Sequence, residues 1–108
     1  MGDFNAFLDA LRHNLRELAD NSFKNYEKML VQDGTDFAKR LEEDLQGWSA
    51  EYSIHEMTKE EFEALVKEKK ELLDMEELKK TDLPRTELNK IRNAIVETVT
   101  TTAVKSLL

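Results

Sequence analysis

Three residues near the N-terminus have the types and spacing that could bind a metal ion or relay a proton. Asp9, His13 and Glu17 are four residues apart, which stacks their side chains along one face of a helix. A neutral imidazole beside carboxylates suits zinc binding and proton transfer at neutral pH. The same spacing also arises on any exposed, charged helix face, and these residues complete no recognised ligand pattern. We therefore expect a solvated polar face, with no metal and no cofactor.

The second histidine repeats the carboxylate–imidazole pair, because His55 follows Glu51 by four residues. The segment from His55 to Lys59 begins His-Glu but lacks the second histidine of a zinc-protease helix. Neither histidine follows a glutamate by three positions, as the di-iron sites of helical bundles require. The ligand sets of both metal chemistries are therefore incomplete.

Other catalytic signatures are also missing from the sequence. Asp33-Gly34 opens a segment like a calcium loop, but Phe37 stands at the fifth loop position, where an oxygen ligand is needed. The chain has 3 glycines, which are scattered, so it has no glycine-rich phosphate loop. It has no cysteine, which excludes disulfides, thiolate catalysis and cysteine-ligated metals. We expect no catalytic residues and no enzymatic activity.

The charge balance argues against two classes of partner. The formal net charge is −7, and both nucleic acids and membrane surfaces are themselves anionic. The N-terminus has no basic start followed by an apolar run, and no apolar stretch approaches the length of a membrane span. We therefore expect no nucleic-acid partner, no membrane association and a cytoplasmic location.

Composition and periodicity indicate an all-α chain with one domain over residues 1–108. Charged residues make up 36%, and 3 glycines with 1 proline are too few for the many turns of an all-β protein. Short connections between helices favour antiparallel neighbours. The prediction is an antiparallel four-helix bundle of up-down-up-down order. Its helices are expected at about 3–31, 36–55, 59–80 and 85–107.

Two of these helices contain possible breaks. The first follows a stripe with spacings of four and three residues: Phe4, Leu8, Leu11, Leu15, Ala19, Ser22, Tyr26 and Met29. Asp20-Asn21-Ser22 could end it early, because short polar side chains compete for backbone hydrogen bonds; we favour a continuous helix. Asp33-Gly34 is typical of a turn and separates the first helix from the second. Gly47 could kink the second helix.

The start of the third helix carries the clearest local signal. Thr58 and Glu61 form a capping box, and Met57 can pack on Phe62 as a hydrophobic staple. Pro84 separates the third helix from the fourth. The fourth is so rich in valine and threonine over residues 96–104 that a strand competes with a helix there; we favour the helix.

The fourth helix has more apolar surface than a peripheral helix needs. One stripe contains Leu88, Ile91, Ile95, Val99 and Ala103. A second flank, spaced by four, four and three residues, contains Val96, Thr100, Val104 and Leu107. The second flank indicates either deeper burial within one chain or a surface shared with another chain. We take these four residues as the candidate interaction surface.

Together these patterns favour a non-catalytic protein interaction or scaffold module. The expected molecule is an acidic helical bundle that associates with itself, as a homo-oligomer, or with another protein through its C-terminal helix. The alternative is a helical bundle that binds a small apolar ligand between its helices, or a metal.

Overall fold

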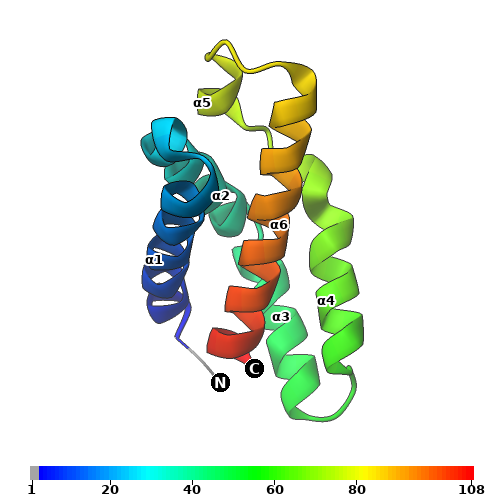
Figure 1. The fold of residues 1–108 in the computed structure, drawn as a ribbon. Helices are drawn as coiled ribbons and strands as arrows, with labels where there is room; N and C mark the ends of the chain where they lie inside the picture. The colour runs from blue at the N-terminus through cyan, green and yellow to red at the C-terminus, as the bar shows by residue number, and fades with distance from the viewer. Residues whose placement is uncertain (1–2) are drawn as a thin grey trace.

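The structure is a computed structural model that describes residues 3–108. Over that range the chain is helical without strands, and it measures 46 × 23 × 20 Å. The elements are α1 (Phe4–Ser22), η1 (Lys24–Tyr26), α2 (Glu27–Arg40), α3 (Glu42–Ser53), α4 (Lys59–Glu68), η2 (Lys69–Leu72), α5 (Glu76–Lys79) and α6 (Arg85–Leu107). Figure 1 shows α1, α6 and α4 side by side, with α6 in the middle and α2 behind; the start of α1 and the end of α6 lie at the same end of the molecule.

The all-α prediction is confirmed, but the predicted division into four helices is not. The described residues form six α-helices and two short 3-10 turns. The predicted helix over 3–31 is divided between α1 and α2, and the predicted helix over 59–80 is divided between α4, η2 and α5. Only the helix over 85–107 has the bounds that the sequence predicted.

The first helix ends where the sequence has its three short polar residues. Asp3 caps its start, since the Asp3 carboxylate accepts a hydrogen bond from the Asn5 amide at 3.1 Å. The helix stops after Ser22, and Phe23 leaves the helical conformation to pack against the core. The preference for a continuous helix was therefore wrong, because the backbone leaves the helical conformation at Phe23, with φ −142° and ψ 48°.

The turn predicted at Asp33-Gly34 was also wrong, because both residues lie inside α2 and are buried. A Cβ on Gly34 would lie 2.7 Å from Leu15 Cδ1 and 3.4 Å from Ile95 Cγ2. The glycine is therefore needed for the close approach of α1 and α6 to α2. The helix bends later, at Leu41, which is buried and has φ −95° and ψ 5°.

The possible kink at Gly47 does not occur. Gly47 lies inside α3, with nothing within 4 Å of the place where its Cβ would be. The first turn of α3 carries Glu42, Glu43 and Asp44, whose negative charges favour a helix start near the positive end of the helix dipole. The predicted helix over 36–55 is thus divided at Leu41, with no break at Gly47.

The capping box at the start of α4 is confirmed. The Glu61 amide donates to Thr58 Oγ1 at 3.1 Å, and the Thr58 amide donates to Glu61 Oε1 at 2.9 Å. Phe62 is fully buried, and its ring meets Trp48 of α3 edge to face at a centroid distance of 6.3 Å. Met57 is partly buried against the same core, which agrees with the predicted staple.

Arginines from other helices hold the connection between α4 and α5, which consists of η2 and residues 73–75. Arg40 donates to the Leu72 carbonyl at 2.7 Å and pairs with Asp74 at 2.9 Å. Arg92 of α6 donates to the Leu73 carbonyl at 2.9 Å. These partners replace hydrogen bonds that the segment loses by leaving the helix.

The strand alternative for residues 96–104 is excluded, because α6 is continuous for 23 residues. Threonine hydroxyls in this stretch donate to carbonyls four residues earlier: Thr98 to Ala94, Thr100 to Val96 and Thr102 to Thr98, at 2.7 to 2.8 Å. Polar threonines can therefore be buried in the helix without leaving a hydroxyl unpaired.

Candidate interaction surface

Helix α6 is the central element of the fold. It packs against α1, α2, α3 and α4, and its apolar stripe is buried among them. Ile91, Ile95, Val99 and Ala103 have no exposed surface. This position explains why one helix needs more apolar surface than a single stripe provides.

The four residues of the candidate interaction surface lie mostly inside the chain. Thr100 is 1% exposed, Leu107 4% and Val96 7%. Val104 is partly buried and packs against the core from its edge. Of the four, Val104 therefore has the most surface available to a second molecule, and contact between these residues and another chain stays a prediction.

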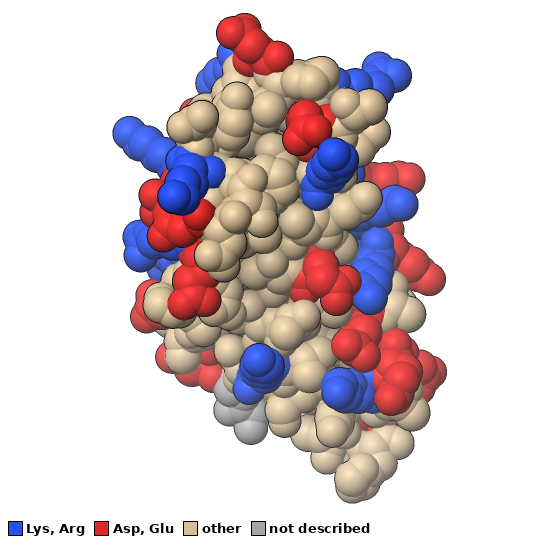
Figure 2. All heavy atoms as spheres, in the orientation of Figure 1, with Lys and Arg blue, Asp and Glu red and all other residues tan. Residues whose placement is uncertain are grey.

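The outer side of α6 carries the exposed charged residues Lys90, Glu97 and Lys105, with small, uncharged residues between them. Ala94 and Thr98 are partly exposed, and Thr101 is exposed. In the space-filling view, uncharged atoms occupy much of the middle of this face, with acidic and basic side chains among them and along its margins (Figure 2). Such a strip is unusual in a chain with 36% charged residues.

A groove of about 330 Å³ runs between α1 and this side of α6. The two helices are linked there, since Asn14 Nδ2 donates to Thr102 Oγ1 at 2.9 Å. Leu18 contributes an apolar patch on the α1 side, and Thr98 and Thr101 line the α6 side. The walls therefore combine polar groups and apolar surface in about equal measure, as a site for protein contact does.

Three charged side chains border the groove. Glu17 pairs with His13 at 3.0 Å on α1. Glu97 lies 3.5 Å from Lys67 of α4, and both of these side chains are at least half exposed. Lys105 forms no salt bridge within residues 3–108. Its ammonium group is therefore available to a carboxylate on another molecule.

The histidine constellations of the sequence are not assembled into a site. His13 and Glu17 are exposed, and Asp9 turns to Arg12, with which it pairs at 3.1 Å. His55 lies beyond the end of α3 with φ 64°, so it does not share a helix face with Glu51. Among residues 3–108, no group of three or more His, Asp and Glu side chains is placed to hold a metal ion.

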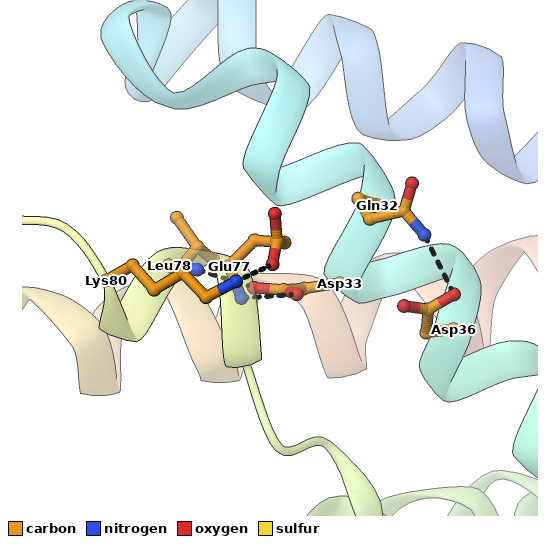
Figure 3. A network of polar contacts seen from close by, with 6 residues as sticks. All are labelled: Gln32, Asp33, Asp36, Glu77, Leu78 and Lys80. Carbon is orange, nitrogen blue, oxygen red and sulfur yellow. Dashed lines mark hydrogen bonds and ion pairs between the residues drawn. The ribbon is translucent and has the colours of Figure 1, made fainter.

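The sequence reading missed a buried carboxylate that joins two distant helices. Asp33 of α2 accepts hydrogen bonds from the Glu77 amide at 3.1 Å and the Leu78 amide at 2.9 Å, both in the first turn of α5 (Figure 3). Burial raises the pKa of the Asp33 carboxyl above its usual value, and the two amide donors partly offset this. Glu77 in turn pairs with Lys80 at 2.9 Å.

One pattern in the sequence could have revealed this arrangement. Leu30, Gly34, Phe37 and Leu41 are spaced by four, three and four residues, which continues a helix through the apparent turn. The partner of Asp33 could not have been found in the same way, because it lies 44 to 45 residues further along the chain. Asp33 serves as a structural cap for α5.

No helix within residues 3–108 has both the length and the apolar character needed to cross a membrane. Comparisons of the chain with models of protein families, with curated proteins and with solved structures found no match.

Proposed function

We propose that this protein is a non-catalytic interaction or scaffold module that binds protein through its C-terminal helix, α6. The outer side of α6 carries the proposal: Ala94, Thr98 and Thr101 form an uncharged, partly exposed strip in a highly charged chain. Side chains of this size allow another helix to approach closely, and the threonine hydroxyls can still bond to water in the free protein.

The rigidity of the strip supports the same function. The inner side of α6 is fixed by the core, and the second flank anchors it further through Val96, Thr100 and Leu107. A surface on a fixed helix loses little conformational entropy when a partner binds. The neighbouring groove is wide open to solvent and its walls are about equally polar and apolar. Small apolar ligands are usually held in enclosed, largely apolar cavities, so this groove favours a protein partner over that alternative.

The experiment compares capture of binding partners by immobilised wild-type protein and by the variant Thr101→Arg. The added side chain fills the strip without entering the core, because Thr101 is exposed. The matched control is Thr86→Arg, which changes the same residue type at an exposed position in the first turn of α6. Circular dichroism establishes that all three proteins are folded.

We expect the wild type and Thr86→Arg to capture the same partner, either another copy of this chain or a different protein. We expect Thr101→Arg to capture none of it. Equal retention by all three proteins would show that the outer side of α6 is not the binding surface, and the proposal would then be rejected.

A further inference from the structure

We propose that the partner is a second copy of this chain, whose α6 packs antiparallel against α6 of the first, with the two-fold axis passing beside Thr101. This inference rests on the proposed function and names its partner. It is argued from the charges and side-chain sizes on the outer side of α6.

The charges on this side are self-complementary about Thr101. Glu97 precedes Thr101 by four residues and Lys105 follows it by four, which places them roughly 6 Å below and above it along the helix axis. At 100° per residue they lie about 40° to opposite sides of Thr101. A two-fold axis that passes between the two helices beside Thr101 brings Glu97 and the partner's Lys105 to the same height, and the symmetry makes this pair twice. The two charges meet when the helices cross at about 50°, the angle that aligns their rows of residues four apart.

The existing contacts leave these charges available. Lys105 has no salt bridge within the described residues, and the contact between Glu97 and Lys67 is long, at 3.5 Å, and exposed to solvent. A parallel arrangement of two α6 helices would instead bring Glu97 against the partner's Glu97 and Lys105 against the partner's Lys105. The charge pattern thus selects the antiparallel arrangement, which also opposes the two helix dipoles.

Uncharged residues flank this contact. Thr98 lies three positions before Thr101 and Val104 three positions after, about 60° to opposite sides of it, so the two residues border the contact without facing each other across it. Ala94 and Leu108 are related in the same way, at seven positions on either side. Leu108 is 38% exposed and Val104 only partly buried in the single chain. Association therefore covers part of the apolar surface that the single chain leaves open beside Thr101.

The first test measures mass by sedimentation equilibrium over a concentration series. We expect the wild type to approach twice the 12.6 kDa of one chain. Glu97→Lys and Lys105→Glu each replace two attractive pairs by two repulsive ones, so each should raise the dissociation constant about tenfold or more. The double variant restores opposite charges and should return it to within about threefold of the wild type. Lys28→Glu, an exposed charge reversal on α2, is the control and should have no effect.

The second test uses the absence of cysteine from the natural chain. Helices that pack 8 to 10 Å apart bring directly facing Cα atoms to about 5 Å, which suits a disulfide. Thr101→Cys should therefore form a covalent dimer under mild oxidation. Thr86→Cys, at the far end of the same helix, should form much less.

The results separate the inference from the proposed function. If the wild type keeps the mass of one chain at every concentration, the inference is overturned. The proposed function would still hold if the wild type captures a different protein and Thr101→Arg does not. A dimer that neither single charge reversal weakens, or that the double reversal does not restore, overturns the antiparallel register. So does cross-linking that is no faster at residue 101 than at residue 86.

Discussion

The segment Asp33-Gly34 and the connection between α3 and α4 each adopt the backbone conformation that their amino-acid composition would suggest for the other. Asp33-Gly34 has the residues of a turn, yet both lie buried in the middle of α2. The chain turns between α3 and α4 without glycine or proline, and His55 takes a left-handed conformation with φ 64°. The His55 and Glu56 amides donate to the Tyr52 and Glu51 carbonyls at 3.1 and 2.8 Å, which is the Schellman ending of a helix.

The difference between these two regions shows which physical property each residue supplies. Neither described glycine has a positive φ, and the two positive-φ residues are His55 and Met75. Gly34 is required because it has no Cβ, and Asp33 is required because it carries two acceptor oxygens. Space and hydrogen bonds, rather than backbone freedom, determine the residues inside α2. The α3–α4 connection tolerates backbone strain because it is exposed.

The largest expected effect is that of Asp33→Ala, which removes the shared acceptor of the Glu77 and Leu78 amides. Two buried amides would lose their partner, so we expect the free energy of unfolding to fall by about 2 to 4 kcal/mol. Chemical denaturation measures this change. Asp36→Ala, which removes an exposed bond with Gln32 and a negative charge near Asp33, is the control and should change stability by less than about 0.5 kcal/mol. Equal effects of the two variants would show that Asp33 is no special anchor.

Gly34→Ala tests whether space selects the glycine. The new methyl group would meet Leu15 at the crossing of α1 and α2, and overpacking of this kind, less the gain in helix propensity, should destabilise by about 1 to 2 kcal/mol. The double variant with Leu15→Val should lose less than the sum of the two single effects, since the smaller side chain relieves the contact. Simple additivity in the denaturation midpoints would contradict the close approach.

Gly47→Ala is the opposite case, because its Cβ would point into open space within α3. Replacement should stabilise the fold by about 0.5 to 1 kcal/mol through helix propensity alone. A rise in the thermal midpoint measures it. A fall would mean that Gly47 has a role that the single chain does not reveal.

His55→Gly relieves the strain at the α3–α4 connection. Glycine adopts a positive φ without a Cβ clash, although it also gains freedom in the unfolded chain, so a stabilisation of about 0.5 kcal/mol is expected. His55→Ala is the comparison, since it removes the imidazole and keeps the strain. If alanine stabilises as much as glycine, the imidazole rather than the backbone is the source of the cost.

The smallest expected effect is the change of stability with pH. It separates the contribution of the Asp33 charge from that of Asp33 as a hydrogen-bond acceptor. Burial raises the pKa of Asp33 in the folded chain above 3.8, its ordinary value. Between these values the folded chain holds a proton that the unfolded chain has lost, so acidification through this window stabilises the fold and rising pH reverses the gain. The stability of the wild type relative to Asp33→Asn should therefore increase as pH falls toward 3.8. A constant difference across the titration would contradict this.

Local signals predicted the parts of the fold in which neighbours along the chain supply the interactions. The capping box of Thr58 and Glu61 and the full extent of α6 are of this kind. The continuation of α2 through Gly34 could not be read from turn propensity, because its benefit comes from packing against Leu15 and Ile95. Tertiary contacts of this kind override local preference.

The candidate interaction surface also has a part that local sequence patterns predicted and a part that depends on tertiary contacts. The sequence identified α6 as having excess apolar surface, but it could not show how the other helices would cover it. Val96, Thr100 and Leu107 are enclosed because α6 packs against four helices at once. The exposed strip around Thr101 was not selected, since threonine and alanine contribute little to an apolar pattern.

The capping of α5 by Asp33 has a consequence for the order of folding. A helix of four residues cannot persist alone, because forming its first turn costs more conformational entropy than one turn of hydrogen bonds returns. Its amides at Glu77 and Leu78 become protected only after α2 has formed and docked. Because this contact joins segments 44 to 45 residues apart, hydrogen exchange of the α5 amides would report directly on whether α2 and α5 are packed together.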